Sequence, residues 1–169
     1  MEQHSVEAIV RALNAANVRY LIAGELAVVA HGYVRFTADI DLILDLEPAN
    51  VKHAVAAFKC LGYRPRAPVE LDDFADPAKR AQRVRDEGLT VFSLYSSVHL
   101  ATEIDLFVDV PLDFDEGYRT AARMEVAPGA GATFIGLQEL LRLKQLAGRA
   151  QDLLDLDRLK ALQKGKASE

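Results

Sequence analysis

The sequence predicts an α/β fold, with a small mixed sheet flanked by helices and a helical C-terminal portion. Two short stretches, residues 39–44 and 102–108, alternate apolar and polar side chains in the manner of β-strands. Between and beyond them, apolar residues recur every three to four positions, which is the spacing of amphipathic helices. The leucine-rich stretch from Leu137 onward keeps this helical spacing and forms the predicted C-terminal portion.

The composition is that of a globular protein. The chain has 169 residues, half of them hydrophobic, and a formal net charge of −5. We expect one domain over residues 1–164, followed by a flexible tail over 165–169. The acidic balance argues against broad electrostatic binding to nucleic acids or to anionic membranes. A single cysteine, no apolar run near 18 residues and no basic leader predict a cytoplasmic protein.

The first half of the chain alternates helices with short strands. The pattern predicts a helix, a strand, a helix, a strand and a helix, in that order, at residues 5–17, 20–23, 26–31, 39–44 and 48–61. Ser5 is the expected cap of the first helix. Gly24 can turn the chain without a Cβ clash, and Gly32 can end the short helix that follows. The segment 63–76 alternates prolines with acids and predicts a surface connection.

The pattern in the second half of the chain predicts a β-hairpin with helices before and after it. The expected elements are a helix from 76, strands at 89–95 and 102–108, a helix at 113–118, an edge strand at 124–126, a turn at 128–131 and helices at 137–148 and from 152. The helix from residue 76 carries the densest basic cluster, formed by Lys79, Arg80, Arg83 and Arg85. This cluster is either a solvated helix face or a guide for a polyanionic acceptor.

Residues 24–44, GELAVVAHGYVRFTADIDLIL, combine a turn, a short helix and a strand that carries two acids. Because strand side chains alternate between faces, Asp39 and Asp41 share one face. Partly buried neighbouring carboxylates need a compensating cation, and carboxylate oxygens favour Mg²⁺ or Mn²⁺. On an exposed strand, the same acids would only add surface charge. A third acid, Asp105, can join them if the stretch 102–108 pairs in the same sheet.

These features resemble a known group of enzymes. A glycine after a strand, a short helix, the pattern Arg-x-Thr-x-Asp-x-Asp over residues 35–41 and a later lone Asp on a strand resemble the nucleotidyltransferase superfamily with the DNA polymerase β-type fold. More narrowly, the chain resembles the minimal nucleotidyltransferases related to the AbiEii toxins of type IV toxin–antitoxin systems. The resemblance covers residues 20–44, 102–107 and, less specifically, 137–159, where LRLKQLAGRAQDLLDLDRL is similar to the family's Lys-x3-Gly-Arg-x2-Asp-x2-Asp ending.

The resemblance implies an Mg²⁺- or Mn²⁺-dependent enzyme that takes a nucleoside triphosphate as substrate. The implied metal-binding and catalytic residues are Asp39, Asp41 and Asp105. The implied nucleotide-binding residues are Gly24, Glu25, Arg35, Thr37 and Lys144. For Arg35 and Lys144, a role as ordinary surface side chains remains the alternative. The family usually has Gly-Gly or Gly-Ser where this chain has Gly24-Glu25, so the added acid predicts weakened activity.

The expected reaction is transfer of a nucleoside monophosphate to a macromolecule, either tRNA or a cognate partner protein. The resemblance implies a toxin–antitoxin or defence role. Two alternatives remain open at this point. One is a non-catalytic protein that keeps the nucleotidyltransferase fold as a protein-binding module. The other is a small-molecule nucleotidyltransferase, such as an antibiotic-modifying enzyme.

Overall fold

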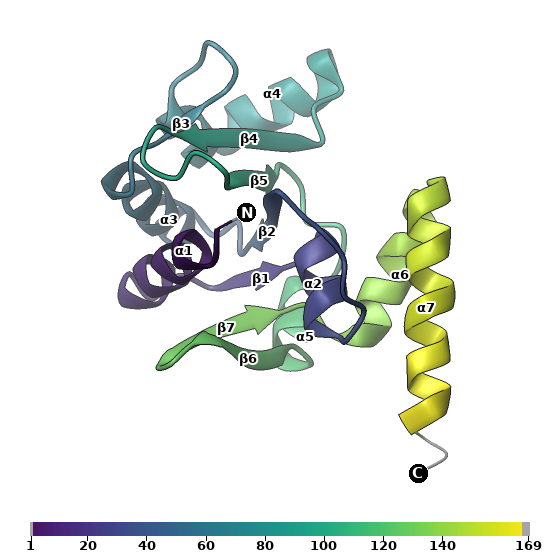
Figure 1. Ribbon diagram of the computed structural model, residues 1–169. Coiled ribbons are helices and arrows are strands. Elements are labelled where there is room, and N and C mark those ends of the chain that lie inside the picture. Colours follow the sequence, from purple (N-terminus) through teal and green to yellow (C-terminus); the bar gives the residue numbers. More distant parts are fainter. Residues whose placement is uncertain (1, 167–169) are drawn as a thin grey trace.

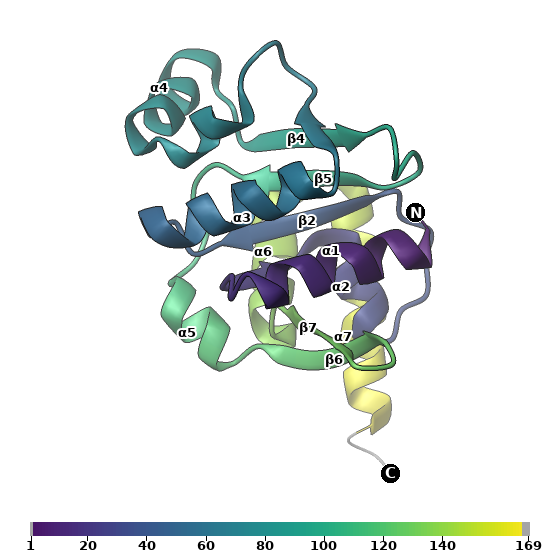
Figure 2. The same ribbon diagram turned by 90° about the vertical axis from the view of Figure 1, so that its left-hand side faces the viewer.

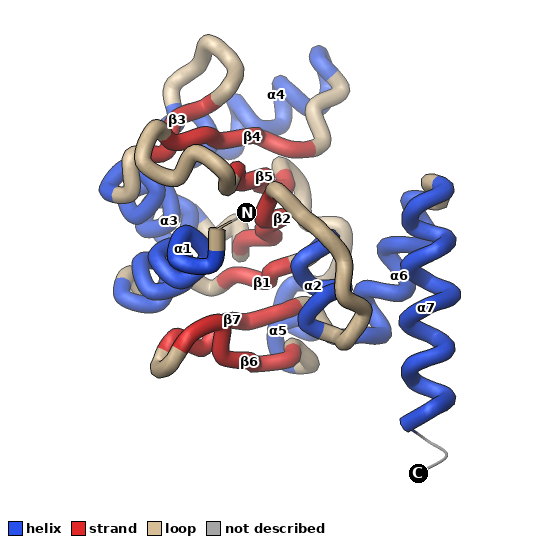
Figure 3. Tube along the Cα trace, in the orientation of Figure 1, coloured by secondary structure: helices blue, strands red, loops and turns tan. Residues whose placement is uncertain are grey.

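The computed structural model describes residues 2–166 and shows an α/β protein with a seven-stranded mixed open sheet (Figures 1 and 3). The predicted fold class is confirmed. The strands are β1 (Tyr20–Ile22), β2 (Asp39–Leu44), β3 (Tyr63–Pro65), β4 (Val91–Ser96), β5 (Glu103–Phe107), β6 (Ala122–Ala127) and β7 (Ala130–Phe134). They are ordered β3-β4-β5-β2-β1-β7-β6 across the sheet.

Helices lie on both faces of this sheet. They are α1 (Gln3–Ala15), α2 (Gly24–Ala30), α3 (Pro48–Cys60), α4 (Pro77–Glu87), α5 (Phe114–Arg119), α6 (Leu137–Ala147) and α7 (Ala150–Lys166), with a short 3₁₀ helix at Leu71–Ala75. Helices α1 and α3 lie on one face, and α2, α6 and α7 lie on the other, as the two views show (Figures 1 and 2). Among residues 2–166, no helix is both long and apolar enough to cross a membrane.

Strand β2 has one fully apolar face, and its other face carries two acids followed by the buried Ile43. Ile40 and Leu42 are completely buried, whereas Asp39 and Asp41, which alternate with them, remain partly accessible. The burial therefore follows a period of two over residues 39–42, whereas Ile43 and Leu44 at the end of the strand are both buried. Strand β2 pairs antiparallel with β1 and parallel with β5, and β5 pairs antiparallel with β4. The predicted pairing of β4 with β5, and of the two acidic strands with each other, is confirmed.

Several local predictions are wrong. Helix α1 begins at Gln3, and Ser5 lies buried inside it with its Oγ 2.9 Å from Nδ1 of His99 instead of capping the helix. The predicted turn at 128–131 is shorter, because the chain enters β7 at Ala130. Helix α7 continues through Lys166, so the predicted tail is helical at residues 165–166, and 167–169 lie outside the described residues.

The segment 63–76 is not a plain surface connection. It contains the edge strand β3 and a 3₁₀ helix, and Leu71 and Phe74 of that helix are almost completely buried. Their apolar side chains are separated by acids, which disguises them in the sequence. Burial of two large side chains stabilises this short helix by about 2 kcal/mol for each side chain.

Candidate functional site

The pairing of β2 with β5 brings the predicted acids to one place. In the parallel register, Asp41 lies opposite Asp105, and Asp39 lies opposite Glu103. Asp39, Asp41 and Asp105 line a cleft of ≈ 530 Å³ that is bounded on its other side by residues of α6. Glu103 is engaged elsewhere, because its carboxylate pairs with the guanidinium of Arg66. The structure therefore groups the three predicted carboxylates and leaves the fourth acid outside the group.

Gly24 lies directly against Asp41. Its φ is +57°, a conformation that glycine adopts without a Cβ penalty. A Cβ built on Gly24 would lie 1.8 Å from Oδ2 of Asp41, which no side chain could tolerate. Two independent constraints, the backbone angle and the close approach, thus require glycine at this position. The glycine also leaves the Asp41 carboxylate open to the cleft.

The electrostatics of the site concentrate on Asp41. Burial, together with the neighbouring charges of Asp39 and Asp105, raises the pKa of Asp41 to about 6. The positive charge of Lys144 acts in the opposite direction. Burial likewise raises the pKa of Asp105, whereas a hydrogen bond from Ser93 opposes the rise. Ionisation of all three acids is therefore unfavourable in the absence of a cation, and a bound cation would stabilise the ionised carboxylates.

Two hydroxyl groups position the outer acids. The Oγ1 of Thr37 lies 3.1 Å from the carbonyl oxygen of Asp39 and 3.2 Å from its Oδ1. The Oγ of Ser93 donates to Oδ1 of Asp105 at 2.5 Å, from the position directly opposite Asp105 on β4. The sequence reasoning included Thr37 but missed Ser93. The sequence predicts the hairpin but not its register, and the register is what places Ser93 beside the acid.

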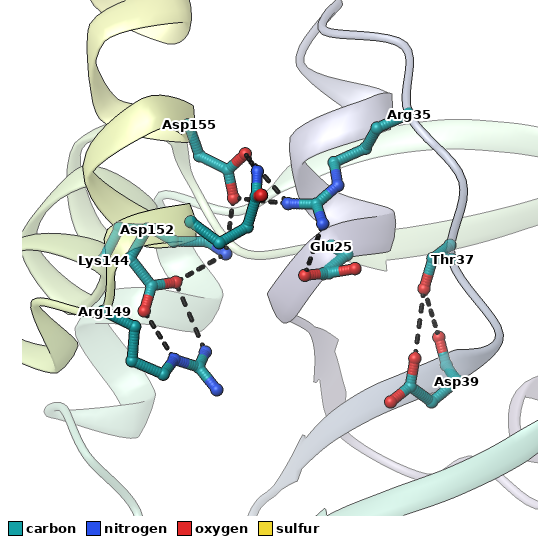
Figure 4. Close-up of polar contacts among 9 residues, drawn as sticks. Glu25, Arg35, Thr37, Asp39, Lys144, Arg149, Asp152 and Asp155 are labelled. Atoms are coloured by element: carbon teal, nitrogen blue, oxygen red, sulfur yellow. Dashed lines mark hydrogen bonds and ion pairs between the residues drawn. The ribbon is translucent and has the colours of Figure 1, made fainter.

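The basic residues implied to bind phosphate are all engaged with acids (Figure 4). Arg35 contacts Glu25 at 2.8 Å and Asp155 at 2.8 Å. Lys144 is 5% exposed, and its Nζ lies 2.9 Å from carboxylate oxygens of both Asp152 and Asp155. Each cation would have to exchange an acid for a phosphate in order to bind one.

The predicted nucleotide-binding residues therefore fall into two groups. Gly24, Glu25 and Lys144 line the cleft with the three acids. Thr37 is buried behind Asp39, and Arg35 is 18% exposed and lies between Glu25 and α7 (Figure 4). Arg35 and Thr37 thus support the residues that face the cleft instead of lining it.

The donor chemistry of the cleft fits a hard divalent cation, because carboxylate oxygens are its preferred ligands. As they are placed, however, no three acidic, histidine or cysteine side chains among residues 2–166 form a group that could hold a metal ion. In this arrangement Asp39 and Asp105 accept hydrogen bonds from Thr37 and Ser93, and Asp41 lies beside Asp105. The residues that would bind Mg²⁺ or Mn²⁺ are these three acids.

The basic cluster on α4 is not an open positive patch. Arg80 is 7% exposed and donates a hydrogen bond to the carbonyl oxygen of Phe74. Lys79 and Arg83 both contact Asp73, and Arg83 also pairs with Glu87. The helix face is therefore neutralised by nearby acids, which weakens its interpretation as a guide for a polyanion.

No protein-family model matches the sequence, and a search of curated proteins finds no significant match. The functional interpretation therefore depends on the geometry and chemistry of this cleft.

Proposed function

We propose that this protein is a metal-dependent nucleotidyltransferase that transfers a nucleoside monophosphate from a nucleoside triphosphate to a macromolecule. The observation that carries the proposal is the parallel register of β2 and β5, which places Asp41 beside Asp105 on the face that also carries Asp39. The requirement for glycine at position 24, directly against Asp41, adds support. The resemblance of residues 20–44 to the AbiEii-type nucleotidyltransferases points to the same chemistry.

In such a reaction, a hydroxyl group attacks the α-phosphate and pyrophosphate leaves. A bound divalent cation would activate the attacking oxygen and neutralise charge on the phosphates. Asp39 and Asp41 would hold the cation, and Asp105 would contribute to its binding and accept the proton of the attacking hydroxyl. Gly24 leaves room for the Asp41 carboxylate at the cleft, because it has no side chain.

The proposed acceptor is tRNA or a partner protein, and the proposed setting is a toxin–antitoxin or defence system in the cytoplasm. Glu25 lines the cleft, and it is expected to weaken the activity because the AbiEii-type nucleotidyltransferases that the chain resembles usually have a small residue there. A small-molecule acceptor, such as an antibiotic, is the remaining enzymatic alternative.

One observation favours a second candidate function, that of a non-catalytic protein-binding module. The cations that would neutralise a triphosphate, Arg35 and Lys144, are already paired with acids. A fold that no longer binds nucleotide would be expected to saturate its charges in this way. The two candidates differ in one measurable respect, which is the covalent transfer of a nucleotide.

The decisive experiment asks whether a labelled nucleotide becomes covalently attached to an acceptor. The protein is incubated with Mg²⁺ and each of the four triphosphates labelled at the α-phosphate, in the presence of total tRNA, cell lysate or an aminoglycoside. We expect one acceptor to become labelled by one of these triphosphates, and not by the same triphosphate labelled at its γ-phosphate. The Asp41→Asn variant should transfer none. Failure to label any acceptor under all these conditions would favour the non-catalytic module.

A further inference from the structure

The cleft has a second, apolar part that the acids do not explain. Besides two alanines, six apolar residues line it together with the carboxylates: Val91, Phe107, Pro111, Leu140, Leu143 and Leu146. They come from β4, β5, the segment after β5 and one side of α6. Leu146 is 74% exposed, so a large apolar side chain projects at the mouth of the cleft without being covered. Together with the other apolar side chains of the cleft, Leu146 forms an apolar lining beside a few polar groups, which is typical of ligand-binding clefts.

The strand register places the apolar part of the cleft next to the acidic part along β4 and β5. Phe107 follows Asp105 by two residues on β5 and therefore lies on the same face, roughly 7 Å farther along the strand. Val91 lies opposite Phe107, just as Ser93 lies opposite Asp105. An aromatic ring and a β-branched side chain thus continue the row of residues that begins at the acids.

Helix α6 supplies the facing side. Leu143 and Leu146 are three positions apart and lie on one helix face, with Leu140 one turn earlier. The polar side chains that line the cleft are the acids, the basic residues with their partners, and Thr90. Within the described residues, Thr90 is therefore the one cleft-lining side chain outside the charged groups that could donate a hydrogen bond to a base edge.

We propose that this apolar part binds the nucleobase, and that it selects the triphosphate by ring area instead of by its hydrogen-bonding edge. The inference rests on the proposed function, because it assumes that the phosphates lie at Asp39, Asp41 and Asp105. The base then stacks on Phe107 and contacts Leu146. Stacking on an aromatic side chain accepts any base, whereas discrimination between adenine and guanine requires polar side chains aimed at the edge.

The prediction has a clear order of affinities. Purine triphosphates bind more tightly than pyrimidine triphosphates because they bury more ring surface, by about threefold or more. ATP and GTP bind with similar affinity. Leu146→Ala weakens binding of all four triphosphates by about threefold, and Phe107→Leu, which removes the ring but retains apolar volume, weakens binding by about fivefold or more.

The test measures dissociation constants by calorimetry with Mg²⁺ and ATP, GTP, CTP, UTP or inorganic tripolyphosphate. Tripolyphosphate has no base, so Leu146→Ala should leave its affinity unchanged. Leu154→Ala is the matched control, because Leu154 is an exposed leucine on α7 that does not line the cleft. Phe107→Leu is compared with the wild type for its free energy of unfolding.

Two negative results are distinguishable. Nucleotide binding that Leu146→Ala and Phe107→Leu leave unchanged would overturn the base-binding surface alone. A preference for one base by a hundredfold or more would do the same, since it would require edge recognition. If neither the nucleotides nor tripolyphosphate bind, the proposed function fails and the base-binding surface fails with it.

Discussion

Gly24 and Asp41 constrain each other at the scale of single residues. The glycine must lack a side chain because the Asp41 carboxylate occupies the position of its Cβ. The carboxylate is held in a half-buried place where its negative charge is unfavourable, and its pKa is raised to about 6. Such an arrangement is costly for folding alone, which is why it points to a bound cation.

The first prediction concerns Asp41→Asn. The substitution keeps the volume of the side chain but removes a carboxylate, so we expect Mn²⁺ affinity to fall by at least about a hundredfold, since even partners that only orient a metal ligand contribute 10- to 100-fold. Titration monitored by electron paramagnetic resonance measures this. Asp45→Asn is the control, because Asp45 pairs with Arg19 away from the cleft. Unchanged Mn²⁺ affinity in Asp41→Asn would exclude the metal site.

The same variant gives a pH dependence of stability. Because the folded pKa of Asp41 is about 6 and its ordinary value is 3.8, the folded state binds more protons than the unfolded state between these values. Without metal, wild-type stability therefore falls as the pH rises through this range. Asp41→Asn lacks this loss and should be more stable above pH 6, by at most about 3 kcal/mol, because Asp39 and Asp105 share the titration.

The second prediction concerns Glu25→Gly. A triphosphate beside Glu25 would meet like charge, and two charges about 4 Å apart repel by roughly 4 kcal/mol at an effective dielectric constant near 20. Even a quarter of this corresponds to about a fivefold loss of affinity. The substitution also releases Arg35 from one of its two acids. We expect Mg²⁺-triphosphate binding to become about fivefold tighter by calorimetry.

Glu25→Gln serves as the control for the second prediction, because it removes the charge while keeping the length of the side chain. It should strengthen triphosphate binding in the same direction. Equal or weaker binding in both variants would mean that Glu25 is a bystander or that its ion pair with Arg35 orients the loop for binding.

At this scale, the sequence predicts residues whose place depends on local periodicity. Asp39, Asp41 and Asp105 could be assigned to one face because alternation along a strand fixes the side of each residue. The partners of Arg35 could not be assigned. Asp155 lies 120 positions away along the chain, and the contact exists only because α7 packs across α6 and reaches the loop before β2.

At the scale of elements, α7 is joined to the rest of the fold by buried charges. Asp155 is fully buried and accepts contacts from Lys144 of α6 and Arg35 of the loop before β2. The loop before β2 therefore meets the two C-terminal helices at one carboxylate (Figure 4). The periodicity of the leucines predicted both C-terminal helices, but it could not predict which acid would lie inside.

The third prediction concerns Asp155→Asn. An amide cannot neutralise the two cations, so Lys144 keeps only Asp152 and Arg35 keeps only Glu25, and we expect the free energy of unfolding to fall by about 2 kcal/mol. Chemical denaturation measures the loss, and hydrogen exchange should show the earliest opening in α7. Asp157→Asn is the control on an exposed face of the same helix. Equal stability of the two variants would show that the buried pairs do not hold α7.

The elements that sequence reasoning missed are short and lie toward the edges of the sheet. Strand β7 consists of Ala130–Phe134, and its alanines and glycine carry little of the β-branched or aromatic character that marks a strand. It forms because the neighbouring β1 and β6 offer backbone partners. Strand β3 has three residues and includes Pro65, which ordinarily argues against a strand and is tolerated here at an edge.

At the scale of the whole molecule, charge decides which acceptors the protein can bind. The chain carries a net charge of −5, and the segment 71–87 that contains α4 has five acids against four basic residues. The contacts of Lys79 and Arg83 with Asp73 neutralise the outer part of the cluster. A folded protein with this distribution attracts RNA phosphates weakly, even though the sequence of α4 is rich in arginine.

The last prediction tests this distribution with the double variant Lys79→Gln, Arg83→Gln. If α4 contacted RNA, each lost phosphate contact would reduce the slope of log affinity against log salt by about one unit. Because both side chains are already paired with Asp73, we expect the slope for total tRNA to change by less than one unit in all. Filter binding between low and moderate salt measures it, with Arg119→Gln as an exposed control away from α4. A reduction of about two units would show that the pairs open on binding and would restore α4 as an RNA-contacting surface. If tRNA binding depends only weakly on salt in both the wild type and the double variant, a partner protein is favoured as the acceptor. A protein acceptor would be recognised by surface complementarity and not by its charge alone.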